Sequence, residues 1–254
     1  MKVLLLGGNG LLGGELRDVL RANSEITLFS PGSLVLNILD LQGLQNFCHS
    51  TKPDLIINTV AYTNVDKAET ERDDCYALNV QAVKNLLTLG TPLIHVSTDY
   101  VFGDGNLDPI PEADAVNPLN YYGETKAEAE RLISQADIDH WIIRSSWLFG
   151  QYGSNFIETM LRLGKEKPLL KVINDQMGRP TSAQELAKFM VDHFVLETPE
   201  TGMYHFQNSG MPVTWYGLVQ FVWDAVESKN MATVQPITTE DWNAAANRPR
   251  NSVL

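Results

Sequence analysis

Three side chains of this sequence have the types and the spacing for proton transfer at a carbonyl group. Tyr122 and Lys126 are four residues apart, so a helix over residues 120–135 places them on one face. A lysine ammonium there favours the ionised phenol, and we expect the pKa of Tyr122 to lie below its usual value of about 10. Thr98 ends an apolar run and can offer a hydroxyl to the same site. This catalytic trio (Thr98, Tyr122 and Lys126) suits the interconversion of a ketone and an alcohol.

Such chemistry needs a hydride carrier, and the amino terminus offers a place for one. The apolar residues 3–6 predict a buried strand, and Gly7, Gly10 and Gly13 follow it directly, before a helical pattern over residues 15–22. Glycines between a strand and a helix let the backbone approach a pyrophosphate, which the free amides at the helix start then bind. The alternative is a glycine-rich turn that only closes a strand–helix connection. The catalytic trio downstream favours the dinucleotide site.

Short apolar segments alternate with helical patterns along the first 146 residues. Continuous apolar strands between helices predict a parallel sheet that is covered on both faces, with ligands beyond the carboxyl ends of its strands. We therefore predict a Rossmann-type, doubly wound α/β domain over residues 1–146. Further strands are predicted at residues 26–29, 54–58, 92–96 and 140–144, and further helices at residues 74–89 and 120–135.

The remaining chain, residues 147–254, is less regular and predicts a smaller, interleaved part that mainly binds substrate. A segment near residues 181–200 is expected to pack back on the first domain. Residues 103–119 are rich in Gly, Pro, Asp and Asn and predict a long surface loop that could act as a substrate lid. Three local patterns are predicted in the second part: a polar turn over residues 174–181, a capping box of Ser182 and Glu185 that opens a helix to about residue 196, and a helix over residues 215–226.

Composition and charge exclude several other classes of protein. The 254 residues are 44% apolar, which is enough for a buried core, and the net charge of −12 argues against a general binder of nucleic acid or of anionic membranes. Cys48 and Cys75 form no C-x-x-C pair, and no charged and then apolar leader precedes the first strand, so we expect a cytoplasmic protein. The five histidines lack metal-ligand spacing, and no metal is expected.

An ordered set of segments resembles the extended short-chain dehydrogenase/reductases, and among them the dTDP-4-dehydrorhamnose reductase family. Each segment is a weak signal by itself, but the set covers essentially the whole chain in the family's order. Family members usually continue past the position of Leu254 with a further helix. The segments are residues 7–13, 61–69, 97–102 and 118–126, followed by 144–147, 155–156, 160–163, 175–176, 248–249 and 251–252.

The resemblance implies NAD(P)-dependent reduction of the 4-keto group of dTDP-6-deoxy-L-lyxo-4-hexulose to dTDP-L-rhamnose. Tyr122 would protonate the developing alkoxide while Lys126 holds the nicotinamide ribose. Thr98 would donate a hydrogen bond to the ketone oxygen, and this bond strengthens as negative charge develops. The expected partner is thus a dTDP-linked ketosugar, with neither nucleic acid nor membrane, and a homodimer is compatible with the chain.

The resemblance also implies two sets of binding residues. Simpler structural readings are packed aromatic side chains for Tyr100 and Trp147, a solvated turn residue for Arg179 and a strand cap for Thr98. Asp66, Glu69 and Glu71 are expected to form a solvated helix start. The cofactor set is Gly7, Asn9, Gly10, Leu11, Leu12, Asn37, Ala61, Tyr62, Thr63, Tyr122 and Lys126, and the substrate set is Thr63, Val65, Thr98, Asp99, Tyr100, Trp147, Asn155 and Arg179.

The preferred cofactor and the exact activity stay open at this stage. Ser30 stands where an acid after the second strand would bind the adenosine ribose, and Asn37 stands where the family often has an acid in the next loop. We therefore predict NADPH or NADH, with a slight preference for NADPH. One alternative is a reductase of another nucleotide-linked ketosugar. The other is a non-catalytic protein on the same fold, similar to the regulatory subunit of methionine adenosyltransferase.

Overall fold

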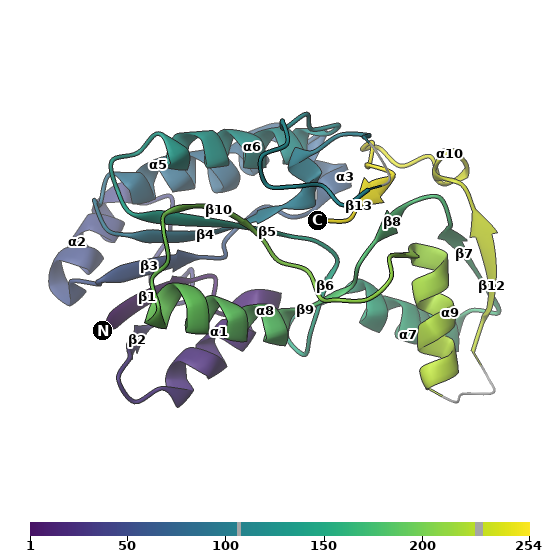
Figure 1. The fold of residues 1–254 in the computed structure, drawn as a ribbon, viewed down its shortest axis with the longest axis horizontal. Helices are drawn as coiled ribbons and strands as arrows, with labels where there is room; N and C mark the ends of the chain where they lie inside the picture. Colours follow the sequence, from purple (N-terminus) through teal and green to yellow (C-terminus); the bar gives the residue numbers. More distant parts are fainter. Residues whose placement is uncertain (106–107, 227–230) are drawn as a thin grey trace.

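A parallel sheet with helices on both faces forms the larger part of the protein, and a smaller part lies beside it (Figure 1). The computed structural model describes residues 1–105, 108–226 and 231–254. Among these residues, no helix is long and apolar enough to cross a membrane. Within them, six parallel strands pair in the order β10-β5-β4-β3-β1-β2, with bounds Lys2–Leu6 (β1), Thr27–Phe29 (β2), Leu55–Asn58 (β3), Leu93–Thr98 (β4), His140–Ser145 (β5) and Gly202–His205 (β10).

Two apolar clusters hold the helices on the two faces of this sheet (Figure 1). Successive side chains of β1 alternate between them, because Val3 belongs to one cluster and Leu4 to the other. This arrangement confirms the predicted doubly wound α/β fold. Helices α1 (Leu11–Ala22) and α8 (Ala183–Met190) cover one face, and α2 (Leu41–Thr51), α5 (Ala82–Leu87) and α6 (Tyr121–Ser134) cover the other.

Two elements differ from their predicted bounds in ways that shape the site. Helix α1 begins at Leu11 rather than residue 15, so its free first-turn amides follow the glycine turn at once. Strand β4 continues past the predicted residue 96 to Thr98, at the carboxyl edge of the sheet.

The predicted helix over residues 74–89 is continuous from α4 (Arg72–Tyr76) to α5, through a π-helical segment, η1 (Ala77–Gln81).

The second part is built on short pairings rather than on one large sheet. Strand β7 (Leu169–Ile173) pairs with β12 (Thr233–Ile237), and helices α7 (Phe156–Glu166) and α9 (Trp215–Ala225) share an apolar cluster with these strands. Its short elements are β6 (Leu148–Phe149) paired with β9 (Thr181–Ser182), β8 (Met177–Gly178) between β11 (Val213–Thr214) and β13 (Asn251–Ser252), and the helix α10 (Thr239–Trp242). Three further short helices belong to the larger part: α3 (Val65–Ala68), η2 (Asp99–Val101) and η3 (Val191–Leu196), which packs against the large sheet.

Two local predictions for the second part are wrong. Residues 174–181 contain β8 and the start of β9 rather than only a turn, because β13, at the far end of the chain, supplies a pairing partner. Ser182 caps α8 by accepting a hydrogen bond from the Glu185 N–H, but its own N–H donates to Asn208 Oδ1 at 2.6 Å. Asn208 thus takes the place that Glu185 has in a capping box.

Candidate active site

The glycine turn fits its predicted role because side chains have no room there. Gly7 has a φ of +86°, a conformation that L-residues with a Cβ rarely adopt. A Cβ on Gly13 would lie 2.0 Å from the Gly7 carbonyl oxygen, so α1 packs directly on the turn. The Gly10 N–H donates to the same oxygen at 2.9 Å. The turn therefore leaves bare backbone and helix amides at the carboxyl end of β1, where a pyrophosphate can be bound.

Two adjoining cavities lie along the carboxyl ends of the central strands, and both are lined by Gly10, Thr59 and Ala61. The turn cavity, of about 310 Å³, is also lined by the predicted cofactor residues Gly7, Asn9 and Asn37, and by Pro31, Gly32 and Ser33. The trio cavity, of about 530 Å³, is also lined by the predicted residues Leu11, Leu12, Thr63, Val65, Thr98, Asp99, Tyr100, Tyr122, Lys126 and Trp147.

Thr98 and Tyr122 meet at the wall of the trio cavity. Both side chains line it, and Thr98 Oγ1 donates to Asp99 Oδ1 at 3.1 Å and accepts from the Tyr100 N–H at 3.2 Å. Burial raises the pKa of Tyr122 above 10, and the nearby Thr98 hydroxyl only partly opposes this effect. The prediction that Lys126 lowers the pKa of Tyr122 is therefore wrong, because desolvation of the phenolate dominates. Tyr122 is held as a neutral phenol, which can donate a proton.

Lys126 is buried, with 1% of its surface exposed. Its Nζ donates to the Val96 carbonyl oxygen at 2.7 Å and lies 2.9 Å from Nε2 of His95. Burial lowers the pKa of Lys126 to about 8, although Glu130 and Cys75 act in the opposite direction. Sequence reasoning missed His95, for which the available signal was a lone histidine inside an apolar strand.

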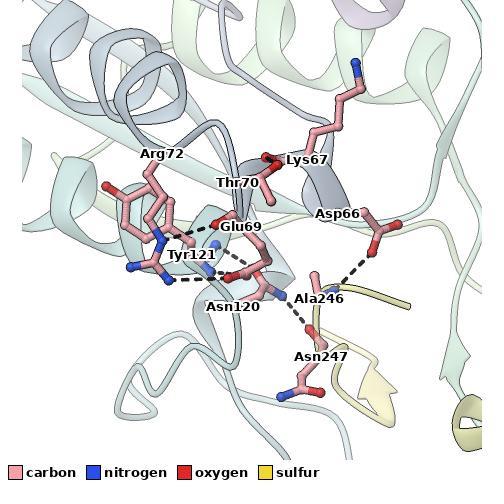
Figure 2. A network of polar contacts seen from close by, with 10 residues as sticks. Asp66, Lys67, Glu69, Thr70, Arg72, Asn120, Tyr121, Ala246 and Asn247 are labelled. Carbon is pink, nitrogen blue, oxygen red and sulfur yellow. Dashed lines mark hydrogen bonds and ion pairs between the residues drawn. The ribbon is translucent and has the colours of Figure 1, made fainter. Parts of the chain in front are cut away.

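The start of α6, which carries Tyr122, is held by contacts from distant segments (Figure 2). Asn120 caps the helix by accepting from the Gly123 N–H at 2.8 Å, and its Nδ2 donates to the Asn247 carbonyl oxygen, also at 2.8 Å. Glu69 accepts from the Tyr121 N–H at 2.9 Å. Residues from α6, from the segment after α3 and from the carboxyl-terminal segment thus fix the start of α6, which carries Tyr122.

The expectation of a solvated helix start at Asp66, Glu69 and Glu71 holds in part. Asp66 lies in the first turn of α3, Glu71 directly precedes α4, and both side chains are 41% exposed, but all three carboxylates also have hydrogen-bond partners. Asp66 accepts from Arg248 at 2.7 and 3.0 Å and from the Ala246 N–H at 3.1 Å, the last of which Figure 2 shows. Glu69 accepts from the Tyr121 N–H, and Glu71 accepts from the Tyr62 hydroxyl. The three carboxylates thus accept hydrogen bonds from tertiary partners that no local sequence pattern indicates.

An aromatic pair forms another wall of the trio cavity. Trp147 stacks on Trp215, with ring centroids 3.4 Å apart and planes 10° apart. Trp147 has a φ of +50°, which is a strained value for a bulky residue, and a Cβ on Gly178 would lie 2.5 Å from its ring. Trp215 was not predicted as a site residue, because its place at the start of α9 carries no sequence signal of a cavity.

The model of the RmlD substrate binding domain family matches residues 1–254 of this sequence. The chain belongs to this family. The dTDP-4-dehydrorhamnose reductase of Aggregatibacter actinomycetemcomitans is 38% identical over 266 residues, covering 100% of this chain and 90% of that protein. The spore coat polysaccharide biosynthesis protein SpsK of Bacillus subtilis (strain 168) is 36% identical over 259 residues, covering 100% of this chain and 88% of that protein.

A solved structure agrees with this membership in the RmlD family. The dTDP-4-dehydrorhamnose reductase of Bacillus anthracis str. Ames in complex with NADP superposes with a TM-score of 0.92 at 34% identity, covering 99% of this chain and 89% of that one. The resemblance to dTDP-4-dehydrorhamnose reductases that the sequence motifs indicated is thereby confirmed.

Three residues to which the family resemblance gave a binding role do not line either cavity. Asn155 caps α7 by accepting from the Glu158 N–H, and its Nδ2 donates to the Gly150 carbonyl oxygen at 3.0 Å. Arg179 donates to the carbonyl oxygens of Gly210 at 3.0 Å and Leu254 at 3.4 Å. Tyr62 is bonded through its N–H to Asn79 and through its hydroxyl to Glu71. Each of these three residues thus has hydrogen-bond partners within the protein.

Proposed function

We propose that this chain catalyses the NAD(P)H-dependent reduction of the 4-keto group of dTDP-6-deoxy-L-lyxo-4-hexulose to dTDP-L-rhamnose. One observation carries the proposal. The cavity that holds Thr98, Tyr122 and Lys126 adjoins the cavity at the glycine turn, so a dinucleotide that spans both brings its reactive end to the trio. The full-length similarity to dTDP-4-dehydrorhamnose reductases supports the choice of substrate.

Each residue of the trio has a different role in the reduction of the carbonyl group. NAD(P)H supplies the hydride when it is bound. Tyr122 donates a proton to the developing alkoxide, and its raised pKa keeps this proton in place at neutral pH. Thr98 contacts the same oxygen and stabilises its negative charge. Lys126, buried below the cavity, donates a hydrogen bond to a ribose hydroxyl of the cofactor.

Residues 1–146 would bind the cofactor, while residues 147–254 mainly bind the sugar nucleotide. The apolar face of a deoxysugar can lie against the wall of Trp147 and Trp215. A preference for NADPH is supported by Arg17, whose Nη1 donates at 3.1 Å to Asn9 in the lining of the turn cavity. A 2′-phosphate placed there would meet a guanidinium.

Oxidation of NADPH in the presence of enzymatically made dTDP-6-deoxy-L-lyxo-4-hexulose tests this proposal. Tyr122→Phe removes the proton donor and keeps the ring, so we expect kcat to fall by about 10²- to 10⁴-fold with little change in cofactor affinity. Tyr121→Phe is the matched control, because this neighbour stacks under Arg72 at the surface and should keep wild-type turnover. A Tyr122→Phe variant with wild-type kcat would remove Tyr122 from the mechanism.

The same assay separates the two alternatives. Turnover with another dTDP- or UDP-linked ketosugar, but not with this substrate, would keep the reductase and change the sugar. Tight NADPH binding without turnover of any nucleotide-linked ketosugar would favour the non-catalytic protein. Catalytic efficiencies measured with NADPH and NADH decide the cofactor, and a strong preference for NADH would contradict the role given to Arg17.

A further inference from the structure

The segment of residues 246–248 bonds two helices of the larger part, although it is far from both in the sequence (Figure 2). The Ala246 N–H donates to Oδ1 of Asp66, in the first turn of α3, at 3.1 Å. The Asn247 carbonyl oxygen accepts from Nδ2 of Asn120, the residue that caps α6, at 2.8 Å. The proposed reaction gives this segment no role, yet it joins α3 to the start of α6.

Arg248 adds a charged contact to the same Asp66 carboxylate. Its Nη1 donates to Oδ1 at 3.0 Å and its Nη2 donates to Oδ2 at 2.7 Å, so the guanidinium bonds both oxygens. Paired bonds of this kind fix the orientation of the two planar groups as well as their distance. Nη1 also donates to the Ala246 carbonyl oxygen at 3.2 Å, which ties the side chain to its own segment. The side chains of Arg248 and Asp66 are 18% and 41% exposed, so solvent screens this pair less than a fully exposed one.

The contact matters for the trio cavity because α3 is too short to hold its own position. This helix has only four residues, too few for stability without outside contacts. Val65 begins α3, directly before Asp66, and lines the trio cavity. The position of Val65 therefore depends on the groups that hold Asp66.

A second residue of the cavity lining lies close to the same guanidinium. Tyr100 lines the trio cavity, and its ring packs edge-on against that of Tyr122, with centroids 6.0 Å apart. Arg248 lies near enough to Tyr100 to act against burial, which raises the pKa of this phenol. Val65 and Tyr100 also pack against one apolar cluster, which contains Tyr122. Arg248 is thus linked to two lining residues, to Val65 through Asp66 and to Tyr100 through its charge.

We propose that Arg248 is a positioning residue for the sugar nucleotide: its paired bonds with Asp66 hold Val65 in the place that, beside Tyr100, shapes the trio cavity. Arg248 is not among the described residues that line this cavity, so it acts through Val65 and Tyr100 rather than on a ligand. The described lining of the turn cavity comes from other segments, and cofactor binding there does not depend on the pair. The inference rests on the proposed function, because it concerns the substrate of that reaction.

Arg248→Lys tests the paired geometry. The variant keeps the positive charge, but an ammonium cannot match both carboxylate oxygens as the planar guanidinium does. We expect the KM for dTDP-6-deoxy-L-lyxo-4-hexulose, and the Kd of the product dTDP-L-rhamnose, to rise about 10-fold. The values of kcat and of the Kd for NADPH should stay within about 2-fold of wild type, because substrate binding is weakened and the chemical step is not. A merely structural role would instead reduce the amount of folded enzyme, which lowers the apparent kcat and leaves KM unchanged.

Asp66→Asn tests the partner of Arg248. An amide offers only one acceptor oxygen, so this variant also breaks the paired bonds. We expect the same rise in KM as in Arg248→Lys. The double variant should show no larger rise than either single variant, because both changes remove one interaction. Effects that multiply in the double variant would overturn the proposal, since the two side chains would then act independently.

Arg250→Lys is the matched control on the same segment of the chain. The Arg250 side chain is exposed, and the residue bonds Asp104 and Met177 through its backbone, which the substitution keeps. The KM and both dissociation constants should therefore match those of wild type. An equal rise of KM in Arg250→Lys and Arg248→Lys would contradict a specific role for Arg248.

Calorimetric titration with dTDP-L-rhamnose separates this inference from the proposed function. If wild type binds this sugar nucleotide and reduces the ketosugar, but Arg248→Lys keeps the wild-type KM and Kd, the positioning role fails and the reduction stands. A parallel rise in the Kd of NADPH would also overturn the role, because the pair would then support the whole fold. If wild type neither binds dTDP-L-rhamnose nor reduces the ketosugar, the proposed function fails, and this inference fails with it.

Discussion

Tyr122 and Lys126 lie one turn apart on α6, yet Nζ of Lys126 is bonded to Val96 and His95. At the scale of the residue, desolvation therefore controls the acid–base chemistry of this site. Burial raises the pKa of Tyr122 and lowers that of Lys126 to about 8, so both groups are held toward their neutral forms. A neutral phenol suits the direction of reduction, in which Tyr122 must have a proton to give.

Asp99 shows the energetic cost of such burial. Desolvation raises its pKa from 3.8 to about 6, even though Thr98 donates a hydrogen bond to Oδ1 at 3.1 Å. The folded state thus binds the proton more tightly than the unfolded state, and the carboxylate form costs up to about 3 kcal/mol. We expect Asp99→Asn to be more stable than wild type by up to this amount at pH 7. The advantage should decline as the pH falls through 6 and vanish below about pH 4.

Urea unfolding of wild type and Asp99→Asn at pH 7 and pH 4 measures this difference. At pH 7 the folded wild type carries a buried charged Asp99, which lowers its free energy of unfolding relative to Asp99→Asn. At low pH the folded and unfolded states both carry a protonated Asp99, so this difference disappears. An equal free-energy difference between the two proteins at both pH values would show that Asp99 has an ordinary pKa.

At the scale of the element, the start of α6 determines where Tyr122 lies. Asn120 satisfies the Gly123 N–H and also bonds the Asn247 carbonyl oxygen. We expect Asn120→Ala to reduce the free energy of unfolding by about 1 to 2 kcal/mol and also to reduce kcat, since the first turn carries Tyr122, the proposed proton donor. Thermal unfolding and steady-state kinetics measure the two effects.

Ser182→Ala is the matched control for this prediction. Ser182 caps α8 through the Glu185 N–H and does not line the trio cavity. Its loss should therefore cost similar stability and leave kcat unchanged. A similar fall of kcat in both variants would mean that lower stability, rather than displacement of Tyr122, explains the loss of activity.

At the scale of the whole molecule, a buried ion pair joins α6 to the sheet. Glu130 on α6 and Arg144 on β5 are 2.7 Å apart with side chains 4% and 3% exposed, and Ser97 on β4 donates to the same carboxylate at 2.5 Å. Glu130→Gln would leave Arg144 buried without its counter-charge. We expect a loss of about 3–5 kcal/mol in urea unfolding.

Glu128→Gln provides the comparison from the same helix. Glu128 pairs with Arg131 at the surface, where the side chains are 35% and 51% exposed, so its loss should cost at most about 1 kcal/mol. Similar losses in the two variants would show that the Glu130–Arg144 pair contributes no more than a surface pair.

The carboxyl-terminal segment joins the two parts of the molecule in a way that no local pattern shows. Arg248 bonds Asp66 across a separation of 182 residues and also contacts Tyr100. Strand β13 pairs with β8 in the second part. The trio cavity is lined by residues of both parts, among them Tyr122 and Trp215, and its shape therefore depends on the assembled fold.

The sequence by itself determined the alternation of strands and helices, the glycine turn and the three side chains that we propose for catalysis. These features depend on residues close in the chain: apolar runs, glycines that permit a tight turn, and a tyrosine and a lysine one helical turn apart. Asn155 and Arg179 were placed by resemblance alone, and the fold gives their polar atoms other partners.

Only the tertiary structure decided the partners and the protonation of the trio. Lys126 meets His95 from 31 residues away, and Trp147 meets Trp215 from another part of the chain. The reason is physical: a pKa depends on desolvation and on neighbouring charges and hydrogen bonds. Burial and neighbours exist only once distant segments have packed, so the sequence identified the chemical groups and the fold set their charge.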